Sequence, residues 1–131
     1  MPFLGQIMDE SSIDLATKEL VIMRVSQLNS CRYCLAAHRS VALDAGVPPE
    51  QLAAVCGMAE LDSLPRRERA IVAWVDQVTR DAGGVSDGLV AVTLDHVREH
   101  QLIELTVLAG TISMLNQYCT AFDVPPPGGD L

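Results

Sequence analysis

Apolar residues recur every three or four positions along almost the whole chain, which is the spacing of amphipathic α-helices. The first such segment runs from residue 14 to about residue 30 without Gly or Pro. Pro or Gly lies near most boundaries of the other expected helices, which cover about residues 31–45, 48–57, 65–81, 86–99 and 101–122. No long stretch alternates with the period of two that strands require. We therefore predict an all-α bundle of about six helices.

The chain of 131 residues has the length of one domain, which we place at residues 1–124. The Pro- and Gly-rich residues 125–131 cannot continue a helix and are expected to form a flexible tail. Residues 1–20 lack the basic start and apolar run of a secretory signal, and no uninterrupted apolar segment approaches about 18 residues. These features predict a cytoplasmic protein without a membrane-spanning helix.

Composition narrows the possible partners. Seventeen acidic residues against nine basic ones give a formal charge of −8, which argues against nucleic acid and against anionic membrane surfaces. Hydrophobic residues make up 49% of the chain and aromatic residues only 4%. A small helical protein with so much apolar surface often buries part of it between subunits, so we expect a homo-oligomer.

The most informative segment contains two cysteines and a histidine. Cys31, Cys34 and His38 fall within about 60° of one another on a helix face, at about 100° per residue. Cys34 and His38 are four residues apart and can touch. Both cysteines lie at the start of a predicted helix, where the helix dipole favours the reactive thiolate. One cysteine can then resolve an oxidised partner as a disulfide.

Glu19 adds a buried acid to this pattern. Its helical neighbours three and four positions away are all apolar: Leu15, Ala16, Ile22 and Met23. A carboxylate in such a position needs a tertiary partner or a raised pKa. His38 on the next helix also has mostly apolar neighbours, so a relay from Glu19 through His38 to a cysteine would satisfy both groups.

Three other interpretations of these residues stay open at this point. Glu19 can pair with Arg39, or with Arg24 of another subunit. Cys31, Cys34 and His38 can be ligands of a structural zinc ion, with a fourth ligand from elsewhere in the fold: Cys56, Cys119, His96 or His100. The cysteines can also be ordinary core residues. We consider redox chemistry the best interpretation.

The combination of Glu19, Cys31, Cys34 and His38 resembles the signature of the alkylhydroperoxidase D-like branch of the carboxymuconolactone decarboxylase superfamily. The residues around the cysteines, the segment Leu64–Ala73, and Asn116 with the later Val-Pro add to the likeness, which covers about residues 10–125. The resemblance implies an all-α fold that assembles as a trimer or hexamer, and a thiol peroxidase that needs neither a cofactor nor a metal.

Carried over by position, the resemblance assigns Cys34 as the peroxidatic cysteine and Cys31 as the resolving cysteine and proton donor. The resemblance also implies that His38 and Glu19 form the proton relay and that a dithiol of protein or lipoyl type restores the pair. Tyr33 occupies a position that is His in the best-characterised hydroperoxidases. It therefore supports an alternative function, a dithiol–disulfide oxidoreductase acting on proteins or small disulfides. A third hypothesis is a non-enzymatic module that binds zinc or senses oxidation.

The remaining features carry less chemistry. His96, Glu99 and His100 match the inverted zinc-peptidase pattern, but we interpret them as the solvated end of the fifth helix. Cys56 and Cys119 lie on apolar helical stripes and are predicted to be buried thiols, and Trp74 is predicted to be in the core.

Overall fold

The computed structural model describes residues 11–127, and within that range it is all-α, as the sequence predicts. Its helices are α2 (Leu15–Leu28), α3 (Arg32–Asp44), α4 (Pro49–Val55), α5 (Arg66–Asp81), α6 (Asp87–Leu94) and α7 (Glu99–Ala121), with short 3-10 turns η1 (Leu61–Ser63) and η2 (Ala82–Gly84). No residue of the described range lies in a strand. Residues 1–10 lie outside the described range, and so do residues 128–131, which are the last four of the predicted flexible tail.

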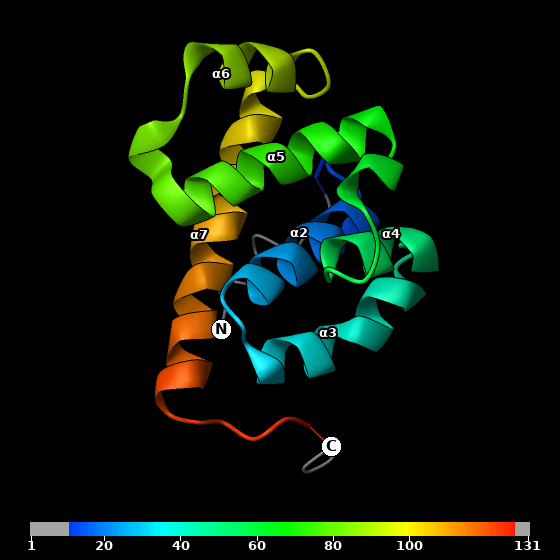
Figure 1. The fold of residues 1–131 in the computed structure, drawn as a ribbon, viewed down its shortest axis with the longest axis vertical. Helices are drawn as coiled ribbons and strands as arrows, with labels where there is room; N and C mark the ends of the chain where they lie inside the picture. Colours follow the sequence, from blue (N-terminus) through cyan, green and yellow to red (C-terminus); the bar gives the residue numbers. More distant parts are fainter. Residues whose placement is uncertain (1–10, 128–131) are drawn as a thin grey trace.

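Helix α2 is the centre of the fold (Figure 1). It packs against α3, α4, α5 and α7, and its residues from Thr17 to Ser26 are all buried. One apolar cluster joins α2 to α5 and α7, and a second joins it to α3 and α4. Trp74 belongs to the first cluster, as predicted, and its indole N–H donates to Thr106 Oγ1 at 2.8 Å. A helix surrounded on all sides must also bury its polar residues.

The buried charges of α2 are paired with neighbouring helices. Lys18 is 1% exposed and lies 3.2 Å from a carboxylate oxygen of Glu104 on α7. Arg24 donates from Nε and Nη2 to the two carboxylate oxygens of Asp76 on α5, each at 2.7 Å, and from Nη1 to the carbonyl of Val55. Because a buried charge without a partner is costly, these contacts fix the position of α2 relative to α5 and α7.

The predicted boundary between the fifth and sixth helices is wrong. Ser86 caps α6 as expected, since its hydroxyl accepts from the Leu89 N–H, but α6 ends at Leu94 instead of near residue 99. Helix α7 begins at Glu99, where the Gln101 side chain accepts from the Arg98 N–H. This capping interaction starts a new helix in the segment that the apolar pattern assigned to the previous one.

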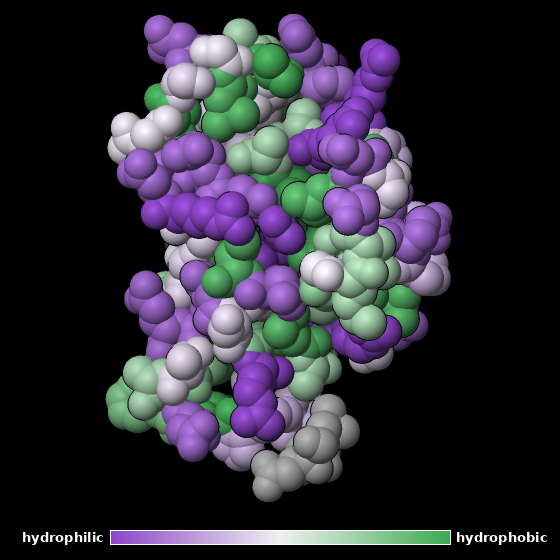
Figure 2. Space-filling view, viewed as in Figure 1, coloured by the Kyte–Doolittle hydropathy of each residue, from purple (hydrophilic) through white to green (hydrophobic). Residues whose placement is uncertain are grey.

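The surface mixes polar and apolar residues. In the view of Figure 2, hydrophilic side chains cover much of the face, and apolar ones gather over α6 at the top. Large apolar side chains are also exposed along α7 and at its C-cap: Ile103, Val107, Met114, Tyr118 and Phe122. The predicted homo-oligomer stays a prediction. Within residues 11–127, none of the helices combines the length and the apolar character needed to cross a membrane.

Candidate redox site

The turn between α2 and α3 places the first cysteine. Asn29 ends α2, and Ser30 has a φ of 54°, in the left-handed region that non-glycine residues seldom adopt. This turn brings the Cys31 N–H to the carbonyl of Ser26, at 3.0 Å. Cys31 then becomes the N-cap of α3, and its sulfur accepts from the Cys34 N–H at 3.3 Å. The three-residue spacing of the cysteines is therefore the spacing between an N-cap residue and the backbone N–H that its side chain accepts.

The two sulfurs face each other inside the protein. Cys31 Sγ and Cys34 Sγ are 2.7 Å apart, and the residues are 1% and 8% exposed. A disulfide requires about 2.05 Å between its sulfurs, so a small rotation of either side chain would bring them to bonding distance when an oxidant removes two electrons and two protons. The predicted proximity of the pair is confirmed.

The expected thiolate at Cys34 is contradicted by its surroundings. Burial raises the pKa of the Cys34 thiol to about 12, and the hydrogen bond with Cys31 acts in the same direction, whereas a hydrogen bond with Asn116 lowers it. Desolvation therefore outweighs the helix dipole on which the sequence argument relied. At neutral pH Cys34 is a protonated thiol, and a base has to remove its proton before it can attack a substrate.

This protonation state gives a pH dependence for alkylation. We expect the reaction of Cys34 with iodoacetamide to accelerate about tenfold per pH unit from pH 7 to beyond pH 10, because only the thiolate reacts. Quantifying the alkylated Cys34 peptide by mass spectrometry at several pH values measures it. A plateau below pH 8 would contradict the raised pKa.

Glu19 and His38 form the predicted pair, in which Glu19 is buried and His38 is partly exposed. Glu19 Oε2 lies 3.0 Å from His38 Nδ1, and the side chains are 2% and 32% exposed. The two alternative partners are excluded in this structure, because Arg24 pairs with Asp76 and Glu19 pairs with His38. The carboxylate fixes the ring by one nitrogen and leaves Nε2 available for proton transfer. His38 is one helical turn after Cys34 on α3.

Cys119 is a further member of the site, which the sequence offered only as one of four possible fourth ligands of a zinc ion. It was expected to be a core thiol, as was Cys56, but both are only partly buried. The sulfurs of Cys31, Cys34 and Cys119 all lie within 4.8 Å of one another. The signal in the sequence was weak: Cys119 is three residues after Asn116, which places both on one face of α7.

Asn116 connects α7 to the turn that carries Cys31. Its side-chain carbonyl accepts from Asn29 Nδ2 at 3.1 Å, and its amide donates to Ser26 Oγ at 3.1 Å. Asn29 also donates to Ser113 Oγ at 3.2 Å. Asn116 is 1% exposed and lies at the centre of this network, which fixes the turn against α7.

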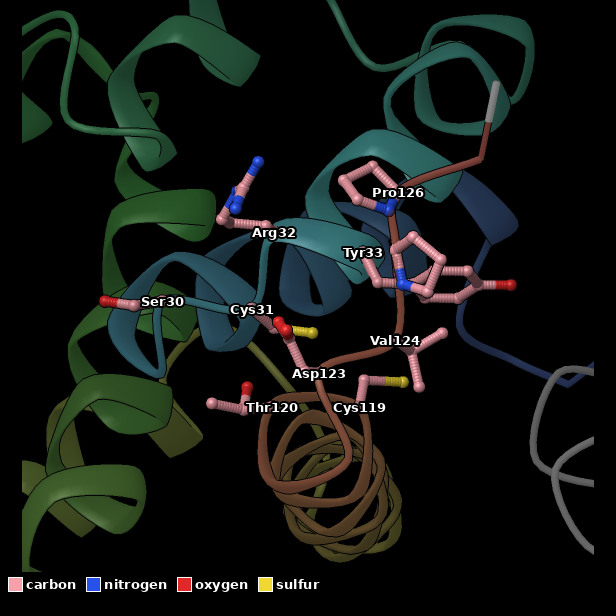
Figure 3. A pocket seen from close by; sticks show the side chains of 10 residues that line it. Ser30, Cys31, Arg32, Tyr33, Cys119, Thr120, Asp123, Val124 and Pro126 are labelled. Atoms are coloured by element: carbon pink, nitrogen blue, oxygen red, sulfur yellow. The ribbon is translucent and has the colours of Figure 1, made fainter. Parts of the chain in front are cut away.

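A small pocket opens beside the thiols (Figure 3). It has a volume of about 180 Å³, and Cys31 and Cys119 both line it. Figure 3 shows these two side chains entering from the start of α3 and the end of α7, with Tyr33 and Pro126 above them in this view. Pro126, in the described part of the proposed tail, is buried. Arg32 and Asp123 supply opposite charges to the lining.

The proposed zinc ligands are not brought together as a set. Among residues 11–127, the candidate ligands close enough to share a metal ion are Cys31, Cys34 and Cys119, and His38 is not among them. Structural zinc sites have four protein ligands, so three thiols do not complete one. The inverted peptidase pattern also fails, because His96 precedes α7 while Glu99 and His100 begin it, and His100 Nε2 lies 3.1 Å from Ser12 Oγ.

Comparison with known families agrees with this geometry. The family model "Carboxymuconolactone decarboxylase family" matches residues 1–77, a segment that contains Glu19, Cys31, Cys34 and His38. This chain belongs to the carboxymuconolactone decarboxylase family. Another similar sequence is the uncharacterized protein YdfG of Bacillus subtilis (strain 168), which is 28% identical over 113 residues, covering 86% of this chain and 77% of that protein.

Solved structures extend the likeness to the whole fold of this carboxymuconolactone decarboxylase family member. A protein of unknown function from Agrobacterium tumefaciens, suggested to be the antioxidant defence protein AhpD, matches with a TM-score of 0.86 and 24% identity, over 96% of this chain and 87% of that chain. An uncharacterized peroxidase-related protein from Silicibacter sp. TM1040 matches with a TM-score of 0.85 and 21% identity, over 97% and 68% of the two chains. The fold is therefore AhpD-like.

Proposed function

We propose that this protein reduces hydroperoxides with the Cys31–Cys34 pair. The observation that carries the proposal is the combination of two buried sulfurs 2.7 Å apart with His38, one turn further along α3, which is paired with the buried Glu19 of α2. An AhpD-like fold in the carboxymuconolactone decarboxylase family supports it. Family membership alone is also compatible with a decarboxylase, but decarboxylation has no use for a pair of adjacent thiols.

In the proposed cycle Cys34 attacks the peroxide. His38 takes the thiol proton, the thiolate bonds to the terminal oxygen, the O–O bond breaks, and the leaving alkoxide receives the proton from His38. Cys34 becomes a sulfenic acid and the substrate an alcohol. The Cys31 thiol then displaces water from the sulfenic acid and closes a disulfide. An external dithiol, of protein or lipoyl type, reduces the disulfide and becomes oxidised itself.

The raised pKa of Cys34 explains why such a site would need His38. Burial favours the neutral thiol, so the thiolate forms only as a base accepts its proton. Glu19 forms its hydrogen bond with His38 and acts through the imidazole, whose positive charge it stabilises once the proton arrives. Glu19 is thus a positioning residue, whereas His38 is the base.

A second candidate function is thiol–disulfide exchange with proteins or small disulfides. Cys31 lines the pocket and accepts a backbone N–H, as the attacking cysteine of a C-x-x-C oxidoreductase does at a helix start. Tyr33 separates the cysteines and lines the same pocket. In this function Cys31, rather than Cys34, would react first.

Initial rates on matched substrates distinguish the two functions. The reduced protein would be assayed with cumene hydroperoxide and, separately, with a small disulfide, using dihydrolipoamide as the electron donor in both cases. We expect faster turnover of the hydroperoxide. Disulfide turnover that is much faster than peroxide turnover would favour the exchange function instead.

Glu19→Gln tests the relay. The substitution keeps the shape of the side chain and removes its charge, so we expect kcat for cumene hydroperoxide to fall about tenfold to a hundredfold. KM should stay within about twofold of wild type, because the 2% exposed Glu19 cannot touch the substrate. Steady-state kinetics with circular dichroism of both proteins measures this. An unchanged kcat in a folded variant would remove Glu19 from the mechanism.

A further inference from the structure

The three-sulfur cluster contains one thiol more than a two-cysteine cycle uses. Cys119 reaches the pair from α7, across a contact between α3 and α7. Cys56, at the end of α4, is the fourth cysteine of the chain and does not belong to this cluster. Cys119 is therefore placed to react with the other two thiols, a role that a thiol used only to fill the core would not have.

The three thiols differ in their access to solvent. Cys31 lines the pocket but is only 1% exposed, and Cys34 is 8% exposed and does not line the pocket, so a disulfide between them offers little sulfur surface to a reductant. Cys119 is only partly buried and lines the pocket of about 180 Å³ beside them (Figure 3). Thiol–disulfide exchange requires direct attack on a sulfur, so an external dithiol has better access to Cys119 than to Cys34.

We propose that Cys119 is a third redox thiol, which takes over the disulfide from the buried pair and presents it in the pocket to the external reductant. The proposal deepens the peroxidase function and rests on it for the origin of the first disulfide. The exchange itself depends only on the positions of the three sulfurs, so it can be tested with another oxidant.

The exchange is balanced without any further reagent. Cys119 loses its proton and its sulfur attacks Cys34 Sγ in the Cys31–Cys34 disulfide. The new bond joins Cys119 to Cys34, the old bond breaks, and Cys31 leaves as a thiolate that takes up the proton. No electrons enter or leave the protein in this step. The external dithiol then attacks Cys119 Sγ, the Cys34–Cys119 bond breaks, and Cys34 leaves and takes up the proton of the attacking thiol. The second thiol of the reductant closes a disulfide within the reductant and releases Cys119 as a thiol.

The surroundings favour Cys31 as the leaving group. Its sulfur accepts the Cys34 N–H at 3.3 Å and lies at the start of α3, where the helix dipole stabilises negative charge. Cys34 has no such advantage, because burial raises the pKa of its thiol to about 12, and a thiol of high pKa leaves slowly. Burial also raises the pKa of Cys119, so the exchange should be faster at pH 9 than at pH 7.

Disulfide mapping after oxidation by diamide tests the proposal. Diamide converts two thiols to a disulfide and is itself reduced to a hydrazine, so the experiment does not require peroxidase activity. The full-length protein would be oxidised at pH 9, quenched in acid, digested with pepsin at low pH and mapped by mass spectrometry. We expect the Cys34–Cys119 linkage together with Cys31–Cys34. Cys31–Cys34 alone, at every time point, would overturn the proposal.

Two variants make the result specific. Cys31→Ser should give Cys34–Cys119 as its main disulfide, because these sulfurs remain within 4.8 Å. Cys56→Ser is the matched control, since Cys56 is also a partly buried thiol with a raised pKa but is outside the cluster, and its disulfide map should equal that of the wild type. Failure of Cys31→Ser to form Cys34–Cys119 would overturn the proposal independently of the wild-type kinetics.

A kinetic measurement completes the test. Cys119→Ser, oxidised by diamide, should be reduced by dihydrolipoamide about tenfold more slowly than the oxidised wild type, because the reductant must reach the buried pair directly. Equal reduction rates would overturn the role of Cys119. If the Cys119 disulfide forms with diamide while peroxide is not consumed, the exchange stands and the peroxidase function fails.

Discussion

Cys34→Ser is expected to lose peroxide turnover, with kcat/KM for cumene hydroperoxide at least about a thousandfold below wild type. A serine hydroxyl fills nearly the same space but cannot accept oxygen from a peroxide and form a disulfide. Cys34 lies at hydrogen-bonding distance from Cys31 and one turn before His38, so the substitution removes the reacting atom and leaves the relay in place. Peroxide consumption in the presence of dihydrolipoamide measures the loss.

Cys56→Ser is the control for this experiment, because Cys56 lies outside the three-sulfur cluster. It should retain turnover within about twofold of wild type, while Cys34→Ser remains folded by circular dichroism. Equal activity of wild type and Cys34→Ser would contradict the assignment of the reacting cysteine. A loss in Cys31→Ser without a loss in Cys34→Ser would favour Cys31 as the first nucleophile.

Asp76→Asn should produce the largest loss of stability. It removes the charge that compensates Arg24, whose side chain is 8% exposed and bound to both Asp76 oxygens at 2.7 Å. Breaking a buried pair at one partner leaves an uncompensated charge, so we expect the free energy of unfolding to fall by about 3 kcal/mol. Urea denaturation followed by circular dichroism measures the change.

Asp62→Asn is the matched control. Asp62 is 95% exposed and lies 3.8 Å from Arg69, so its loss should change the free energy of unfolding by less than about 0.5 kcal/mol. A fall of similar size in both variants, or no fall in Asp76→Asn, would contradict the view that the Arg24–Asp76 pair fixes α2 in the bundle.

The sequence could predict those parts of the fold that depend on local pattern. Apolar periodicity with Pro and Gly punctuation placed α2 to α5 closely, since helix formation follows neighbours in the chain. The apolar neighbours of Glu19 predicted its burial, and the search for a partner led to His38. Both residues are on helices joined by a short turn, so the helix faces that carry Glu19 and His38 could be arranged in few ways.

What could not be predicted depends on distant parts of the chain. Lys18 and Arg24 look like solvent-facing residues of an amphipathic helix until α7 and α5 cover them and supply Glu104 and Asp76. Cys119 is 85 residues from Cys34 in the sequence, and only packing of α7 on α3 brings their sulfurs together.

The raised pKa of Cys34 was missed for a related reason. The start of a helix stabilises a thiolate, and this local effect is visible in the sequence. The opposing desolvation comes from the elements that surround the thiol in the folded protein, and in this site it dominates. Local electrostatics therefore predicted a lowered pKa for Cys34, whereas burial by distant parts of the chain raises it.

A single-turnover titration tests the central claim most directly. The fully reduced wild-type protein, which has four thiols per chain, would be mixed anaerobically with one equivalent of cumene hydroperoxide, and thiols and peroxide counted over time. If the Cys31–Cys34 pair reduces peroxide, one molecule of peroxide disappears as the thiol count falls from four to two per chain. The resulting disulfide should contain Cys34. Peroxide that persists while four thiols remain would contradict the proposed function.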